Sequence, residues 1–213
     1  MARESRKALT ERTGRILDVL AATYPDAACA LDYKNPFELL IATILSAQCT
    51  DVRVNMVTPA LFRAFPTPEA MAAADDTVLI ELIRSTGFFN NKAKNILACC
   101  RDIVTRHGGR VPDTLDQLVK LAGVGRKTAN VVLGNAFGVP GITVDTHMGR
   151  VSRRLGLTRN DDPVKVEHDL MKIVPEDQWT VFSHRVIHHG RALCAARKPK
   201  CGDCPLASDC PSA

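Results

Sequence analysis

The sequence lacks the features that would mark it for a membrane or for export. Its 213 residues contain no apolar run of about eighteen residues, the length that a membrane-spanning helix needs. The N-terminal segment MARESRKALTER has no apolar core of the kind found in secretory signal peptides. We therefore expect a cytoplasmic protein.

Strand patterns, low-complexity segments and internal repeats are also scarce. Gly141–Val144 is the one short stretch with a strand-like pattern. Apolar residues elsewhere recur every three or four positions, which predicts amphipathic helices. Asn35 followed by Pro36 is a typical helix start, since asparagine caps the first amides and proline suits the first helical position. We expect an all-α protein with helices near 36–45, 51–64, 76–85, 91–106, 114–121, 126–137, 146–155, 163–173 and 178–190. Expected caps are Asp75, Asp76, Asn90 and Asp113.

Acidic residues are missing from one basic segment near the C-terminus. The net charge is +5, which suits a polyanionic partner without requiring one. Residues 184–200 contain no Asp or Glu and carry Arg185, Arg191, Arg197, Lys198 and Lys200. This basic segment is either a solvated face or a surface that contacts phosphates, and its proximity to a cysteine cluster favours the second interpretation.

The segment LAGVGRKTAN, 121–130, predicts a tight turn between two helices. We expect Gly123 and Gly125 to supply positive φ angles. The first amides of the following helix would then face outward and, with the helix dipole, could bind a phosphate. The arrangement resembles the helix-hairpin-helix motif, which binds DNA through its backbone without reading sequence. A Gly-x-Gly turn that only reverses the chain remains the alternative.

Lys127 and Asp145 are the candidate catalytic residues. An ammonium group in the first turn of a helix opposes the helix dipole, which favours the neutral amine that a nucleophile needs. Asp145 precedes an apolar-periodic helix and is predicted to be its N-cap. A carboxylate there could also take a proton from an attacking amine and oppose positive charge on a sugar. A surface lysine paired with a phosphate is the alternative for Lys127.

The eight cysteines fall into two groups. Four are scattered in apolar helical contexts and are predicted to be small buried hydrophobes. The other four, Cys194, Cys201, Cys204 and Cys210, have six, two and five residues between them. Structural zinc usually takes two Cys-x2-Cys pairs, and only one is present here. The compact spacing instead suits four thiolates around a 4Fe–4S cluster.

These segments, together with ILSAQCTDVRVN (44–55) and VDTH (144–147), resemble the endonuclease III family of DNA glycosylases over nearly the whole chain. The resemblance implies a six-helix barrel lobe at 29–139 that contains the helix-hairpin-helix at about 114–137. It also implies an iron–sulfur lobe formed by 1–28 with 140–213, and a DNA-binding cleft between the lobes. The activity implied is that of a bifunctional DNA glycosylase and abasic-site lyase of base excision repair, acting as a monomer on oxidised pyrimidines.

The same resemblance assigns roles to individual residues. Lys127 becomes the nucleophile and Asp145 the catalytic carboxylate. Gln48 matches a gap-filling glutamine, and Phe88 stands where the family usually has an apolar wedge; the alternatives are a polar residue at a helix end and a core residue. His147 is a weaker candidate for a phosphate contact. The DNA-binding residues expected in all are Gln48, Phe88, Asn90, Gly123, Val124, Gly125, Arg126, Thr128, His147, Arg191, Lys198 and Lys200.

Two other functions are compatible with parts of the sequence. A mismatch-type DNA glycosylase shares the hairpin and the cysteine spacing, but such enzymes lack a lysine at the position of Lys127. A non-catalytic iron–sulfur DNA-binding protein would need the hairpin and the cluster but neither Lys127 nor Asp145. Turnover on damaged duplex DNA distinguishes the enzyme from the binding protein.

Overall fold

The computed structural model of the protein describes residues 4–213, and these residues form helices and loops with no β-strand. The expected all-α fold is therefore confirmed, and the strand-like pattern at Gly141–Val144 forms no strand, because this segment is irregular. Along residues 4–213 none of the helices combines the length and the apolar character needed to cross a membrane. The chain divides into two compact units, one spanning Cys29–Val139 and the other joining the N-terminal segment through Ala28 to Pro140–Ala213.

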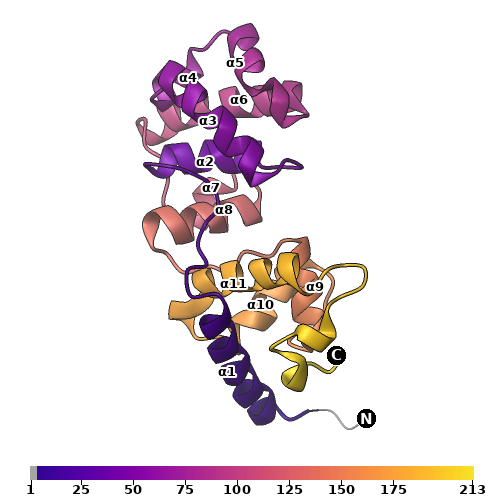
Figure 1. Ribbon diagram of the computed structural model, residues 1–213. Coiled ribbons are helices and arrows are strands. Elements are labelled where there is room, and N and C mark those ends of the chain that lie inside the picture. The colour runs from indigo at the N-terminus through magenta and orange to yellow at the C-terminus, as the bar shows by residue number, and fades with distance from the viewer. Residues whose placement is uncertain (1–3) are drawn as a thin grey trace. The chain divides into compact units, whose positions relative to one another are not determined.

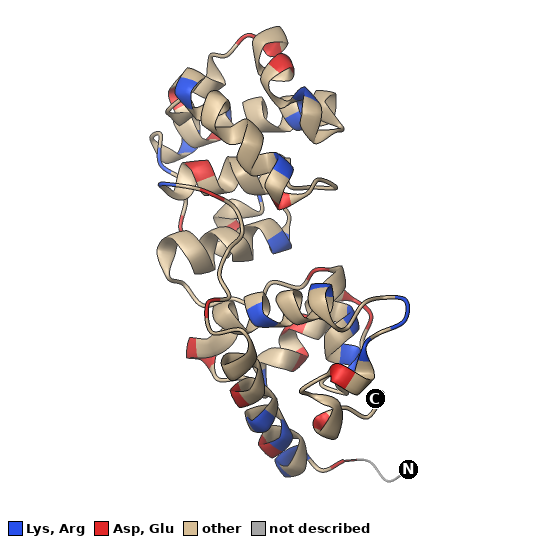
Figure 2. Cartoon of the chain, viewed as in Figure 1, with Lys and Arg blue, Asp and Glu red and all other residues tan. Residues whose placement is uncertain are grey.

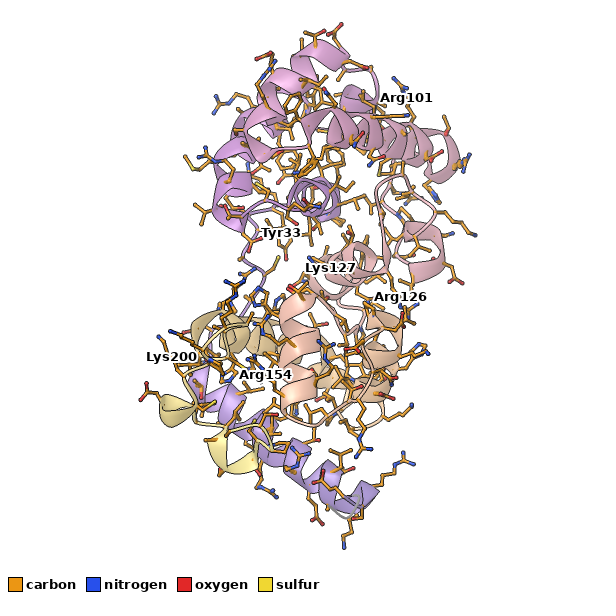
Figure 3. The ribbon with its side chains drawn as sticks, turned by 90° about the vertical axis from the view of Figure 1, so that its right-hand side faces the viewer. Tyr33, Arg101, Arg126, Lys127, Arg154 and Lys200 are labelled. Atoms are coloured by element: carbon orange, nitrogen blue, oxygen red, sulfur yellow. The ribbon has the colours of Figure 1, made fainter. Side chains whose placement is uncertain are left out.

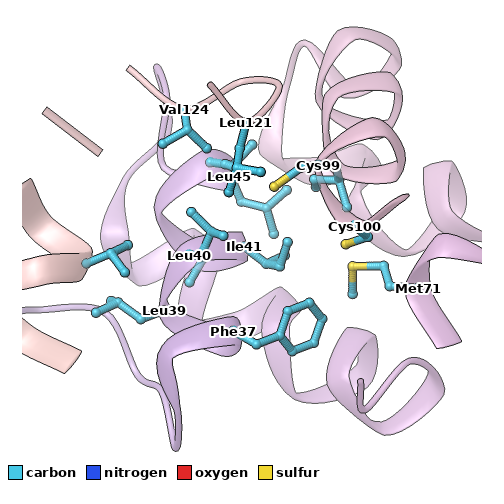
Figure 4. Close-up of a cluster of buried hydrophobic side chains, with 14 of the residues drawn as sticks. Phe37, Leu39, Leu40, Ile41, Leu45, Met71, Cys99, Cys100, Leu121 and Val124 are labelled. Carbon is cyan, nitrogen blue, oxygen red and sulfur yellow. The ribbon is translucent and has the colours of Figure 1, made fainter. Parts of the chain in front are cut away.

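The Cys29–Val139 unit is built around one helix that is buried on all sides. Helix α2 (Pro36–Leu45) places its residues from Leu39 to Leu45 in the core, and Figure 4 shows Leu39, Leu40 and Ile41 among side chains from other helices. A helix that is apolar all round is stable only when other helices cover it. The remaining elements are α3 (Asp51–Ala64), α4 (Pro68–Ala72), α5 (Asp76–Ile83), η1 (Arg84–Thr86), α6 (Phe89–His107), α7 (Leu115–Leu118), α8 (Arg126–Val132) and a π-helical turn, η2 (Leu133–Phe137).

Helix starts in this unit follow the sequence closely. Asn35 caps α2 by accepting a hydrogen bond from Glu38 N–H at 2.9 Å, and Asp75 caps α5 through Thr77 N–H at 2.8 Å. The other caps expected in this unit are wrong. Asp76 and Asn90 lie inside the first turns of α5 and α6, and Thr114, not Asp113, is the N-cap of α7.

The second unit has a separate core. It contains α1 (Arg6–Thr23), α9 (Thr146–Arg154), α10 (Pro163–Met171), η3 (Glu176–Gln178), α11 (Trp179–Ala192), η4 (Cys201–Asp203) and η5 (Ala207–Asp209), which can be followed in Figure 1. Helix α11 packs against α9 and α1. Fully buried residues such as Ile16, Val151 and Phe182 form this core, and three of the C-terminal cysteines pack against it.

Candidate active site

The turn between α7 and α8 depends on one glycine rather than two. Gly123 has φ +75°, and a Cβ added there would lie 2.9 Å from Cβ of Asn95. Gly125 has φ −89° and ψ 173°, an extended conformation open to any residue, so the expected positive φ at Gly125 is wrong. Val124 is buried and its N–H donates to the Leu121 carbonyl at 3.1 Å. Val124 therefore anchors the turn, and its side chain does not reach the surface.

Lys127 is exposed in the first turn of α8, directly after Arg126. Both residues are labelled in Figure 3. Gly125 is the N-cap of this helix, and its carbonyl accepts the first helical hydrogen bond from Ala129 N–H at 3.0 Å. Gly125 has no side chain to cap the first amides. The N–H groups of Lys127 and Thr128 have no acceptor within the helix, as at every helix start. The expected combination of an exposed lysine and a helix N-terminus is present.

Asp145 is the N-cap of α9, as the sequence predicts. Its Oδ1 accepts a hydrogen bond from Met148 N–H at 2.8 Å, and the side chain is half-buried. This bond fixes the rotamer of the carboxylate while Oδ2 takes no part in the cap. Lys127 belongs to the Cys29–Val139 unit and Asp145 to the other unit.

His147 lies on the first turn of α9 and is held by a neighbouring arginine. Its Nδ1 is 3.1 Å from Nη2 of Arg150, and because a guanidinium can only donate, Nδ1 is the acceptor. Arg150 Nη2 also donates to the carbonyls of Gly190 at 3.0 Å and Cys194 at 3.1 Å. The ring nitrogen left for the expected phosphate contact is Nε2.

Gln48 and Phe88 share an unusual backbone conformation. Both lie in the left-handed region, with φ 52° and 49°, and both side chains are exposed. Phe88 is 63% exposed, so the alternative that it is a core residue is wrong. Residues other than glycine adopt such angles rarely, and active sites and ligand-binding segments are enriched in them. Asn90 is exposed in the first turn of α6, close to Phe88 in sequence.

The four C-terminal cysteines line one cavity of about 90 Å³. Side chains from α9 and α11 reach two of the sulfurs: Arg154 Nη1 donates to Sγ of Cys194 at 3.3 Å, and His189 Nε2 is 3.6 Å from Sγ of Cys204. By contrast, burial raises the pKa of Cys99 to about 12 and that of Cys100 further still, so these thiols are inert core residues.

This cavity suits a cluster better than a single ion. Within residues 4–213 no group of three or more His, Cys, Asp or Glu side chains converges as the ligands of one metal ion would. Four cysteine thiolates hold a 4Fe–4S cluster, each bound to a different iron, so the sulfurs need only surround a shared volume. The residues present fit an iron–sulfur cluster in this respect.

The basic segment places several cations beside the cysteine cavity. Arg191, Lys198 and Lys200 are exposed, and Lys198 has φ 51°. Lys200 lines the cavity together with Arg154, and its N–H donates to the Leu193 carbonyl at 3.0 Å. Figure 2 shows lysine and arginine in the loop that leads to the C-terminus, and Figure 3 labels Lys200 and Arg154.

Comparison with known proteins agrees with these features. The sequence profile of the HhH-GPD superfamily of base excision DNA repair proteins matches residues 41–176. Endonuclease III of Synechocystis sp. is 57% identical over 204 residues, covering 95% of this chain and 93% of that protein. The chain belongs to the endonuclease III family. The Bacillus subtilis member is 50% identical over 91% of this chain and 89% of its own length.

Solved structures and a second profile extend this assignment. A non-covalent endonuclease III–DNA complex has a TM-score of 0.91 and 48% identity, covering 95% of each chain. A trapped covalent endonuclease III–DNA intermediate has the same TM-score and identity, covering 95% of this chain and 96% of that chain. The iron–sulfur binding domain of endonuclease III matches residues 194–210, which begin and end at Cys194 and Cys210. The chain is accordingly a base excision repair DNA glycosylase with abasic-site lyase activity and a 4Fe–4S cluster.

Sequence reasoning missed the groups that support the site. Lys92, Arg150, Arg154 and His189 all hold functional segments through hydrogen bonds. One signal was available for Lys92, which lies four residues before the buried Ile96 and therefore on the same apolar face of α6. Nothing in the sequence shows which carbonyls or sulfurs these side chains reach, because every partner in these hydrogen bonds except Thr86 lies at least 15 residues away in the chain.

Proposed function

We propose that Lys127 is the nucleophile and Asp145 the catalytic carboxylate of a reaction that excises oxidised pyrimidines from duplex DNA and then cuts the strand. The observation that carries the proposal is the exposed Lys127 in the first turn of α8, behind the turn at Gly123. A non-catalytic DNA-binding protein would not need an amine at this position. We further infer that the protein acts as a monomer.

The amine of Lys127 attacks C1′ of the extruded nucleotide, and the bond between C1′ and the base breaks, so that the base leaves with the bonding electrons and takes up a proton. Asp145 accepts the proton that the attacking nitrogen loses and opposes the positive charge that develops on the sugar. The C1′–O4′ bond then breaks, O4′ takes up a proton, and C1′ and the nitrogen of Lys127 form a Schiff base. Loss of a C2′ proton then breaks the C3′–O bond by β-elimination, and water releases the unsaturated sugar from the lysine.

The remaining DNA-binding residues hold the duplex around this chemistry. The first-turn amides of Lys127 and Thr128 bind a phosphate, and the adjacent Gly125 lets the backbone approach it closely. Arg191, Lys198 and Lys200 contribute sequence-independent charge. Gln48 and Phe88 fill the gap left in the base stack, because the nucleotide must leave the duplex before an amine can reach C1′. The bound iron–sulfur cluster supplies a fixed anchor for the loop that carries Lys198 and Lys200.

Borohydride trapping tests the nucleophile. Borohydride reduces a Schiff base to a stable covalent link, so the wild-type protein should crosslink to duplex DNA that contains thymine glycol or an abasic site. Lys127→Ala should fold normally because the side chain is exposed, and it should give no crosslink. Lys120→Ala removes another exposed lysine and should trap as the wild type does. A crosslink to Lys127→Ala would remove this lysine from the mechanism.

A substrate panel tests the class of lesion. Duplexes with thymine glycol, dihydrouracil, an abasic site, or adenine and thymine mismatches are compared in single-turnover cleavage. We expect cleavage of the two oxidised pyrimidines and the abasic site. Faster excision from a mismatch than from thymine glycol would support the mismatch-type enzyme instead.

A further inference from the structure

Lys92 is a buried lysine whose ammonium group donates hydrogen bonds to backbone carbonyls and not to a carboxylate. It is 4% exposed, in α6. Its Nζ donates to the carbonyls of Leu45 and Thr86, each at 2.8 Å. Burial lowers the pKa of this amine, and the nearby Cys49 opposes the shift. A lysine placed there costs free energy that an apolar residue would not, so its contacts call for an explanation.

The two carbonyls that Lys92 binds end two different segments. Leu45 is the last residue of α2, and Thr86 is the last residue of η1. The chain reaches Gln48 shortly after the first carbonyl and Phe88 shortly after the second. The backbone N–H of Lys92 also donates to the Phe88 carbonyl, at 3.1 Å. One residue thus contacts both segments that present the expected gap-filling side chains.

The backbone at these two positions needs such support. Gln48 and Phe88 both have left-handed φ angles and exposed side chains. A residue other than glycine keeps a left-handed conformation only when its surroundings fix it. Exposed side chains contribute little to that fixation, so the hydrogen bonds of the flanking backbone have to provide it. The ammonium of Lys92 binds the backbone of both segments, at Leu45 before Gln48 and at Thr86 before Phe88.

We propose that Lys92 is a positioning residue for DNA, whose buried ammonium sets the spacing between Gln48 and Phe88 so that both enter the duplex together. This inference rests on the proposed function, since it assumes that these two residues fill the gap in the stack. Lys92 itself touches neither the DNA nor the reacting atoms. A purely structural lysine would stabilise the unit without favouring duplex over single-stranded substrate.

Lys92→Met tests this proposal, because methionine keeps the length of the side chain and removes its donors. Single-turnover cleavage is measured at an abasic site in a duplex and at the same site in a single strand, where no gap has to be filled. We expect the duplex rate to fall roughly 10- to 100-fold and the single-strand rate to stay at the wild-type value. Lys94→Met, at an exposed position on the same helix, should change neither rate.

A second comparison separates positioning from general damage to the fold. If Lys92 acts through Gln48 and Phe88, Lys92→Met added to Gln48→Ala with Phe88→Ala should slow duplex cleavage no further. Multiplicative losses, or equal losses on both substrates, would overturn the proposal. Should Lys92→Met fail to fold, Lys92→Gln can still donate to one carbonyl and should show the same pattern at smaller amplitude. A wild-type protein without any cleavage would refute the proposed function instead.

Discussion

At the scale of single residues, Asp145 combines a structural and a chemical task. Its Oδ1 caps α9 through Met148 N–H at 2.8 Å, and in the proposed mechanism the same carboxylate accepts a proton. The cap fixes the rotamer, so the carboxylate is oriented before substrate arrives. The two tasks make different demands on the side chain, because a cap needs only an acceptor oxygen whereas proton transfer needs a carboxylate.

Substitution at Asp145 separates these two tasks. Asp145→Asn keeps an acceptor for Met148 N–H, so we expect the melting temperature to change little. Asp145→Ala removes the cap and should cost about 1 kcal/mol of unfolding free energy. Both variants should lose excision rate by about 100-fold or more, which is typical for removal of a general base. Thermal unfolding and single-turnover excision of thymine glycol measure the two effects. Full activity in Asp145→Asn would show that the carboxylate takes no proton.

At the scale of elements, the sequence predicts helix starts well where a side chain forms the cap. Asn35, Asp75 and Asp145 all accept the expected backbone hydrogen bond. Short elements were harder to predict. No helix is expected between 64 and 76, but α4 lies there, capped by Thr67, and α7 is shorter than the helix expected at 114–121. Helices of one turn have too few residues for a period of 3.6 to show, and packing on α6 decides whether α4 forms.

The turn before α8 offers a matched pair of glycine substitutions. Gly123→Ala places a Cβ at 2.9 Å from Cβ of Asn95 in a left-handed conformation, and it should destabilise the protein by about 1 to 3 kcal/mol. Gly125→Ala meets nothing within 4 Å in an extended conformation, and it should leave the melting temperature unchanged.

Gly125→Ala, which should leave stability unchanged, should nevertheless weaken DNA binding. In the proposed function a phosphate approaches Gly125, so the new methyl group of Gly125→Ala should weaken binding to an undamaged duplex. Thermal unfolding and fluorescence anisotropy at one fixed salt concentration compare the two variants. Equal stability of both variants would mean that Gly123 does not require its positive φ, and unaltered binding by Gly125→Ala would place the phosphate elsewhere.

At the scale of the whole molecule, the cysteine spacing predicts the cofactor but not the framework that holds it. The four cysteines share one cavity, and their loop is tied to distant helices by cations. Arg15 of α1 pairs with Asp209, next to the last cysteine, at 2.7 Å, and Arg12 donates to the Asp209 carbonyl at 2.9 Å. Contacts between residues nearly the whole chain apart leave no local pattern in a sequence.

Removal of the cluster should therefore affect the two units differently. The core of the Cys29–Val139 unit consists of its own residues, whereas three of the four C-terminal cysteines pack against the core of the other unit. After oxidation and chelation of the iron, we expect amide hydrogen exchange to become faster in α9, α11 and the C-terminal loop. The amides of α2 and α6 should stay protected from exchange, because unfolding can be confined to one cooperative unit.

Absorption at about 400–420 nm reports whether the cluster is bound. Cys204→Ser should lose this band and Cys29→Ser, which lies outside the cavity, should keep it. Equal loss of protection in both units would show that they fold as one.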